Sequence, residues 1–293
     1  MTGITGCWPA WLAMALGVGG ASVSAAWAGN QALTAGLYGA TLGAGGATAA
    51  ERSAFGQNPA AVEPMRAGGM LHFHRPFGLE EIQVAEAAGF WDFRRAGFAL
   101  GWRQTGVDGL YQEDGWSFNP SLRIGSGEGL PGELTLGAAL ILWQSAMPGF
   151  RSQAWGRGLG WTWRPHPQVK LGGFALDAPL RAPGAPGPDA VWQGGLELSS
   201  RAPSRPTTSY AARQTFRLDA RKTGHTPWRT LASLTVSPHA SVDLSGGLST
   251  APFQVSLGLA LQFAGFRLHP AFRYHRYLGR TLLSTVGFSR ARP

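Results

Sequence analysis

The carboxyl-terminal third of the chain alternates between apolar and polar positions in short segments separated by turns. In the clearest segment, one parity carries Val255, Leu257, Leu259, Leu261 and Phe263, and the intervening positions are small or polar. Because successive side chains of a strand point to opposite faces, this pattern predicts a strand between an apolar medium and a wetter one.

Comparable segments recur from residue 65 to the end of the chain. A transmembrane strand needs about 9–11 residues. With its turn it occupies roughly 16–20, so this length predicts about 12–14 strands. Bacterial barrels have an even strand number, and we expect an all-β fold: a transmembrane antiparallel up-and-down β-barrel of about 14 strands, with 12 also compatible. A soluble periplasmic β-sandwich is the alternative fold, because a soluble sheet produces the same alternation.

Four segments depart from simple alternation. The alternation slips between residues 81 and 93, which suggests a β-bulge. Residues 136–143 are apolar on both parities, so one face there is expected to pack against an inserted segment. Residues 177–189 and 202–207 are rich in proline, which removes donors from a strand ladder, and they are predicted to be exposed loops.

The amino-terminal part divides into two segments. Residues 1–28 have an apolar stretch and a small-x-small site at Ala26-Trp27-Ala28, which predicts a secretory signal peptide, although no Lys or Arg precedes Arg52. A membrane anchor is the alternative. Residues 29–64 are rich in Gly and Ala and do not alternate, and we expect a short helical or irregular plug-like segment in the lumen. A disordered periplasmic leader is the alternative, and residues 65–293 form the predicted barrel.

Composition supports a barrel. Charged residues make up 14% of the chain, against about 25% in ordinary soluble proteins. Its 43 Gly and 12 Trp suit a curved wall with aromatic residues at the membrane interfaces. Cys7 is the only cysteine and lies in the predicted signal peptide, so the mature chain has no disulfide. The net charge of +9 comes from scattered arginines, and this dispersal in an exported chain argues against a nucleic-acid partner.

Two motifs resemble those of a known family. Residues 36–49 read GLYGATLGAGGATA, and residues 55–62 read FGQNPAAV. Residues 246–253 read GGLSTAPF, and residues 274–281 read YHRYLGRT. The first pair resembles the start of mature PorV/PorQ-like outer-membrane proteins, relatives of the FadL-type long-chain fatty acid transporters, and the second pair resembles their last hairpins. The chain departs from this pattern in having Glu51 in place of an acidic run and in ending on Arg-Ala-Arg-Pro.

This resemblance covers both ends of the chain and little of the middle. It implies a 14-stranded barrel in the outer membrane of a Gram-negative-type bacterium, with the amino-terminal segment inside. Carried over to the matching positions, it implies that the plug or gate includes Gly43, Gly45, Gly46, Phe55, Asn58 and Pro59.

Charged residues gather on the parity opposite the apolar one. Those expected to line the lumen are Arg123, Arg213, Arg217, Arg221, Asp243, Arg267, His269 and Arg273. A basic lumen attracts anionic solutes by focusing the field in a narrow pore. The alternative is that these residues form ion pairs within the lumen and contacts to the plug.

No motif indicates catalysis or a cofactor. His72 and His74 share one strand face, as do His269 and His275, but a metal site needs three or four converging ligands. The Gly-rich run 43–46 lacks the lysine of a nucleotide loop. Ser126 has Ile124 and Glu128 two residues to each side, where a nucleophile elbow needs glycines. We therefore expect no enzyme activity and no cofactor.

These observations predict an outer-membrane channel or carrier for hydrophobic or amphipathic small molecules, with outer-membrane lipid around it. In this interpretation residues 37–62 gate or line the path, and inward arginines hold a carboxylate head group. The alternative is a non-transporting barrel, as PorV is, which docks components of a secretion system or of an assembly machinery.

Overall fold

A computed structural model describes the greater part of the predicted barrel and a short piece of the predicted plug. The described residues are 58–61, 66–76, 79, 81–93, 95–107, 109–125, 132–181, 190–200, 213–224 and 226–291. The predicted signal peptide lies outside these residues, as do the predicted plug residues Gly43, Gly45, Gly46 and Phe55.

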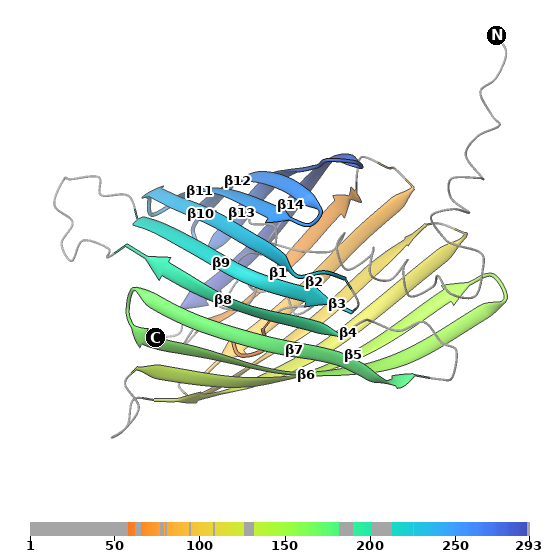
Figure 1. Ribbon diagram of the computed structural model, residues 1–293, viewed down its shortest axis with the longest axis horizontal. Coiled ribbons are helices and arrows are strands. Elements are labelled where there is room, and N and C mark those ends of the chain that lie inside the picture. Colours follow the sequence, from red (N-terminus) through yellow and green to blue (C-terminus); the bar gives the residue numbers. More distant parts are fainter. Residues whose placement is uncertain are drawn as a thin grey trace, which may run out of the picture.

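Fourteen antiparallel strands form one closed barrel in which each strand pairs with its neighbours in sequence and β1 pairs with β14 (Figure 1). The predicted all-β barrel of 14 strands is confirmed, and the 12-strand and β-sandwich alternatives are wrong. No helix of the described residues has the length and hydropathy needed to cross a bilayer. The strands are β1 (Arg66–Arg75), β2 (Ile82–Asp92), β3 (Ala96–Val107), β4 (Tyr111–Ile124), β5 (Glu133–Met147), β6 (Phe150–His166), β7 (Val169–Arg181), β8 (Val191–Ser199), β9 (Arg213–Thr223), β10 (Arg229–His239), β11 (Val242–Thr250), β12 (Phe253–Phe263), β13 (Phe266–His275) and β14 (Gly279–Ala291).

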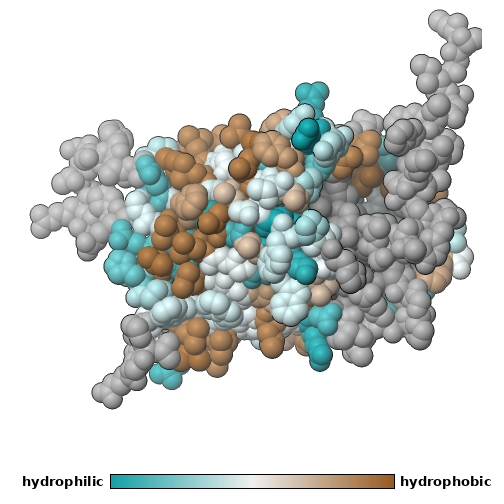
Figure 2. Space-filling model, in the orientation of Figure 1, coloured by the Kyte–Doolittle hydropathy of each residue, from teal (hydrophilic) through white to brown (hydrophobic). Residues whose placement is uncertain are grey.

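Apolar residues of the alternating segments lie on the outer side of the barrel wall, and the polar residues between them lie on the inner side. On β12, Leu257 is 64% exposed, whereas its neighbour Ser256 is 1% exposed. The same relation holds on β1, where Leu71 and Phe73 are exposed and His72 and His74 are buried. Hydrophobic side chains gather in broad patches on the coloured outer face in Figure 2. The exterior is therefore apolar and the interior largely polar, as in a barrel surrounded by lipid.

Exposed aromatic side chains mark both ends of the barrel. Since the strand number is even, β1 starts and β14 ends at the same end. Exposed aromatic residues at that end include Phe93, Phe263, Phe266 and Phe288. Those at the opposite end include Phe150, Trp192, Trp228, Phe253, Tyr274 and Tyr277. Such girdles are typical of the two membrane–water interfaces.

A two-residue turn shows how local sequence sets the register. Ala264 and Gly265 connect β12 to β13 with φ values of 47° and 85°. Positive φ at both central positions gives the turn twist that matches two right-twisted strands. Phe263 and Phe266 consequently face each other on the outer side.

The predicted bulge between residues 81 and 93 is wrong. β2 pairs with both neighbours in continuous register. The alternation of its sequence is irregular because its outward residues Ala85, Ala87 and Gly89 are small while inward Val84 and Phe90 are apolar.

Bulky residues surround these small ones, and a shallow apolar concavity of about 970 Å³ lies on the outer wall. Its lining includes Ala87, Gly89, Leu100, Trp116, Trp155 and Phe288.

The predicted loop 177–189 begins later than expected. β7 continues to Arg181 through Pro179, and the β6–β7 register shifts between Trp155 and Arg157, opposite this proline. An irregularity in the ladder accommodates the missing proline donor. Residues 182–189 and the predicted loop 202–207 lie outside the described part of the chain.

Candidate functional site in the barrel lumen

One side of the lumen is apolar. Inward side chains from β5, β6, β7 and β8 pack into a single buried cluster, here called the apolar wall: Ala139, Ile141, Trp143, Ala154, Phe174, Leu176 and Val191. Gly158 on β6 makes room for it, because a Cβ atom there would collide with the side chain of Leu176. The apolar character of 136–143 on both parities thus reflects a strand with lipid on one side and this cluster on the other.

The turn formed by residues 58–61 lies against β5 and β6. Asn58 Nδ2 donates a hydrogen bond to the carbonyl oxygen of Trp161 at 2.7 Å, and Asn58 Oδ1 accepts one from the Ala60 amide at 2.9 Å. A Cβ atom at Gly160 would collide with Asn58, and one at Gly137 would collide with Pro59 and Ala60. Two strand glycines therefore form the seat of this turn, in which Asn58 is 4% exposed.

The other side of the lumen carries histidines and hydroxyls. His269 on β13 lies opposite Thr285 on β14, which in turn lies opposite His72 on β1. His72 Nδ1 and Thr285 Oγ1 share a hydrogen bond of 2.7 Å, and His72 Nε2 lies 2.9 Å from His74 Nδ1. In a ring of fourteen strands, β13 and β6 are seven apart and lie on opposite sides. This polar wall of β12, β13, β14 and β1 therefore faces the apolar wall.

Charged residues continue the polar wall from β1 onto β2 and β3. Glu86 on β2 lies opposite His72, and Arg103 on β3 lies opposite Glu86. The Arg103 guanidinium carbon sits 5.7 Å from the ring centroid of Trp143, at the edge of the apolar wall. All three charged or aromatic side chains, Glu86, Arg103 and Trp143, are buried. Glu86 and Arg103 therefore connect the polar wall to the apolar wall.

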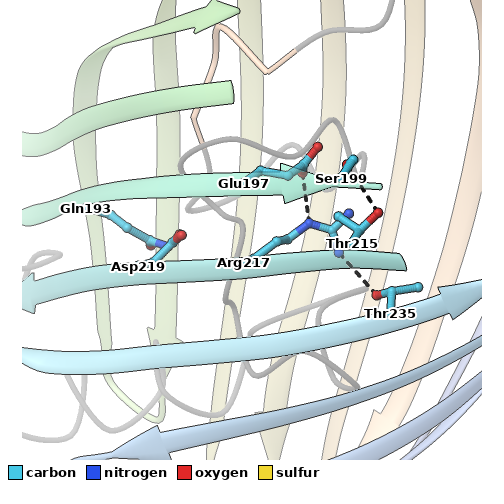
Figure 3. A network of polar contacts seen from close by, with 7 residues as sticks. All are labelled: Gln193, Glu197, Ser199, Thr215, Arg217, Asp219 and Thr235. Atoms are coloured by element: carbon cyan, nitrogen blue, oxygen red, sulfur yellow. Dashed lines mark hydrogen bonds and ion pairs between the residues drawn. The ribbon is translucent and has the colours of Figure 1, made fainter. Parts of the chain in front are cut away.

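Figure 3 shows a second polar network on the lumen faces of β8, β9 and β10. Arg217 Nε donates to Glu197 Oε2 at 2.9 Å, and Arg217 Nη1 donates to Thr235 Oγ1 at 3.3 Å. Beside it, Gln193 Nε2 donates to Asp219 Oδ2 at 2.5 Å. These contacts connect β8, β9 and β10 on the lumen side.

All eight residues expected to line the lumen lie on the inward parity of their strands. Three of the arginines form ion pairs with carboxylates. Arg123 Nε lies 3.0 Å from Glu133 Oε1, Arg217 pairs with Glu197, and Arg267 Nη2 lies 2.9 Å from Asp243 Oδ2.

The remaining predicted residues differ in their surroundings. Arg213 is exposed at the first position of β9, whereas Arg221 lies directly opposite Arg229 on β10. His269 and Arg273 are both buried, at 8% and 5% exposure. The basic set is therefore not one uniform patch.

Sequence reasoning missed several buried charges, chiefly Glu86, Arg103 and Glu113. Glu113 accepts a hydrogen bond from the Tyr111 hydroxyl. The alternation of β3 predicts an inward Arg103, because this residue follows Gly97, Ala99 and Gly101 at every second position. The irregular alternation of β2 gave no such prediction for Glu86, which lies opposite Arg103. Within the described ranges, no group of three or more His, Cys, Asp or Glu is arranged to hold a metal ion.

Comparison with known proteins shows the fold. No protein-family description and no curated protein sequence matches the chain. Among solved structures, Omp33 of Acinetobacter baumannii aligns with a TM-score of 0.52 and 5% identity, covering 76% of this chain and 96% of that one. The CymD monoaromatic hydrocarbon channel aligns with a TM-score of 0.57 and 11% identity, covering 87% and 97%. The chain has the fold of an outer-membrane β-barrel. None of these matches supports the PorV resemblance.

Proposed function

We propose that the protein is an outer-membrane channel or carrier for hydrophobic or amphipathic small molecules, and that residues 37–62 gate or line its path. The observation that carries this proposal is the apolar wall. Ala139, Ile141 and Phe174 face the lumen of a barrel whose other inward positions are largely polar. An apolar surface inside a membrane barrel is costly to hydrate and suits an apolar solute.

Two further features support the proposal. The polar wall lies across the bore from the apolar wall, so an amphipathic molecule finds a match for each of its ends. The likeness of fold to CymD, which is described as a monoaromatic hydrocarbon channel, is in keeping with a hydrophobic cargo. On this proposal the protein functions in the outer membrane, into which it inserts after its signal peptide is removed.

Uptake by whole cells tests the proposal, because the lipopolysaccharide leaflet retards hydrophobic solutes that cross a simple bilayer unaided. Cells producing the protein are expected to take up a radiolabelled monoaromatic hydrocarbon faster than cells carrying an empty vector. Ala139→Trp fills the lumen beside the apolar wall and is expected to reduce the initial rate about threefold or more. Ala138→Trp places the same side chain on the lipid side of β5 and serves as the matched control.

The alternative role in docking is an outcome of the same experiment. Both variants are first checked for the heat-modifiable gel mobility of a folded barrel. Uptake no faster than with the empty vector, from folded protein in the outer-membrane fraction, would contradict transport. That result would favour a non-transporting barrel that engages secretion or assembly proteins through its loops.

A further inference from the structure

A basic edge lies on the outer side of β14 and β1, at the end of the barrel where β14 begins and β1 ends. Arg280 lies directly opposite Tyr274, and Leu282, two residues further along β14, lies directly opposite Arg75. Arg280, Leu282 and Arg75 are exposed, whereas Thr281 between the first two is buried. Diagonal neighbours on one face of two paired strands are about 7–8 Å apart. The side chains of Arg75 and Arg280 are therefore within reach of one ligand.

The charge of this edge is not neutralised within the described part of the chain. No ion pair joins Arg75 or Arg280 to a carboxylate there, and Glu81, in the turn before β2, is exposed and forms none with them. Arg276, in the turn after β13, adds a third exposed cation, whose guanidinium carbon lies 5.4 Å from the ring centroid of Tyr277. The edge thus presents three arginines to the outside.

The surface next to the basic edge, toward the middle of the wall, is apolar. Leu282 on β14, Phe272 opposite it on β13 and Phe73 on β1 are all exposed. A ligand that contacts both surfaces has an anionic head and apolar chains. Such a ligand is a lipid, because this edge lies where the hydrocarbon layer meets the head groups.

The same end of the barrel carries outward hydrogen-bonding groups beyond its apolar surface. On β4 and β5 the outward residues are apolar over nine residues, 116–124 and 134–142. This is about the length of a membrane strand. The next outward residues are Asp114 and Gln144, which lie directly opposite each other, and Gln104 Nε2 on β3 donates to Asp114 Oδ1 at 3.3 Å. Amide and carboxylate groups at this height suit contact with a saccharide head group.

We propose that Arg75 and Arg280 bind a phosphate of lipid A, the glycolipid anchor of lipopolysaccharide. Guanidinium groups bind phosphate through paired, charge-assisted hydrogen bonds. The acyl chains of the lipid then lie along Leu282 and Phe73. Lipid A has a phosphorylated saccharide head, which fits the outward polar groups of this end better than the small head of a phospholipid.

This inference also orients the barrel. Lipid A occupies the outer leaflet, so the end where β14 begins faces the cell surface. The start of β1 and the end of β14 then lie on the periplasmic side. The inference concerns the outer wall and holds for a transporting and for a docking barrel alike.

Lipid binding to the detergent-solubilised full chain, measured by native mass spectrometry, tests the site. The probes are diphosphoryl lipid A and phosphatidylglycerol, and EDTA removes divalent cations that would bridge phosphates. Wild-type protein is expected to bind lipid A about tenfold more tightly than phosphatidylglycerol. The double variant Arg75→Gln, Arg280→Gln is expected to bind lipid A about tenfold more weakly than the wild type. Equal affinity of the wild type for both lipids, or unchanged lipid A binding in the variant, overturns the inference.

The double variant Arg151→Gln, Lys222→Gln is the matched control. It removes the same charge from the same end of the barrel, on β6 and β9. Arg151 lies opposite Ala146 and Lys222 opposite Trp192, so neither faces an acid. Lipid A binding is expected to stay within about twofold of the wild-type value. A loss equal to that of the Arg75 and Arg280 variant shows attraction to overall charge and overturns the site.

Both double variants are first checked for the heat-modifiable gel mobility of a folded barrel. If the Arg75 and Arg280 double variant does not fold, Arg75→Gln and Arg280→Gln are measured singly. Each is expected to weaken lipid A binding about threefold. Unchanged binding in both single variants overturns the inference.

Cysteine labelling of intact cells tests the orientation independently. Leu278 is exposed in the turn between β13 and β14, and Ala240 is exposed in the turn between β10 and β11 at the opposite end. A membrane-impermeant maleimide is expected to label Leu278→Cys in intact cells, and Ala240→Cys only after the outer membrane is permeabilised. The reverse pattern places Arg75 and Arg280 in the inner leaflet, away from lipid A, and overturns the inference.

Discussion

Arg217 on β9 and Glu197 on β8 face each other inside the barrel with 2.9 Å between Nε and Oε2. Their side chains are only 11% and 15% exposed, so both charges need compensation within the protein, and Lys170 lies opposite Glu197 on β7 as a second cation. The neighbouring strand adds Thr235 as a second acceptor for the arginine. This pair holds three consecutive strands in register from the lumen side.

Loss of Arg217 is expected to destabilise the barrel. Arg217→Gln removes the cation that hydrogen-bonds to Glu197 and leaves this buried carboxylate with Lys170, opposite it on β7, which is expected to lower the free energy of unfolding by about 1.5–3 kcal/mol. Urea unfolding in lipid vesicles, followed by tryptophan fluorescence, measures the change. Arg267→Gln is the comparison: its ion pair with Asp243 is 39% and 30% exposed, so its loss is expected to cost about 1 kcal/mol or less. Equal costs for the two variants would contradict this ranking.

Glycine at position 160 is expected to be required for seating the turn of residues 58–61. Gly160→Ala introduces a Cβ atom against Asn58, and we expect a cost of about 1–3 kcal/mol and release of the turn. Limited proteolysis of the folded protein, with mass spectrometry of the fragments, detects cleavage near residue 58.

Gly194→Ala controls for the loss of a strand glycine. The nearest heavy atom to a Cβ at Gly194 is the Gly172 carbonyl oxygen at 3.9 Å, which is ordinary contact. This variant is expected to resist proteolysis as the wild type does. Identical cleavage patterns in both variants would argue against a seat at Gly160.

Removal of residues 37–62 is expected to raise conductance through the barrel. If this segment gates or lines the path, its loss widens the aqueous route, and planar-bilayer recordings should show larger or more frequent openings. Asn58→Ala is the milder change, because it removes the hydrogen bond to Trp161 and leaves the segment in place. We expect an intermediate increase; closed behaviour of the folded deletion variant would refute the plug role.

Leu257 is expected to touch lipid acyl chains. A nitroxide label on Leu257→Cys should be more accessible to oxygen than to a polar nickel reagent, because Leu257 is 64% exposed on the outer wall. Ser256→Cys, one residue away and facing inward, should show low accessibility to oxygen. A label at position 257 that is shielded from oxygen would indicate a second protein layer and remove the basis for a membrane barrel.

Substitution of Leu257 by a charged residue tests the same wall energetically. Leu257→Arg is expected to cost about 2–4 kcal/mol if the residue lies near the bilayer midplane and less near an interface. The cost is measured by urea unfolding in vesicles, with Leu257→Ala as the control for the lost side chain. A cost no greater than that of the alanine variant would place the residue in water.

Strand number and orientation followed from the sequence because both depend on local chemistry. Alternation of Leu257 with Ser256 places one side chain in lipid and the next in the lumen. Chain length divided by the span of a membrane strand gives about 12–14 strands, of which the structure has 14. Alternation did not predict the register of β2, because its outward residues Ala85 and Ala87 are small and its inward residues Val84 and Phe90 are apolar.

The sequence by itself determined a closed barrel with arginines inside, since a charge on the lipid side is penalised wherever it occurs along the chain. Only the tertiary structure decided which of these arginines are neutralised. Arg217 meets Glu197 on the adjacent strand, and Arg267 reaches Asp243 across β12, whereas Arg273 meets Ser256 and Thr281. Strand register determines these contacts between side chains. Closure of the ring places the apolar wall of β5–β8 opposite β13, because strands far apart in sequence are brought across the lumen from each other only when β1 pairs with β14.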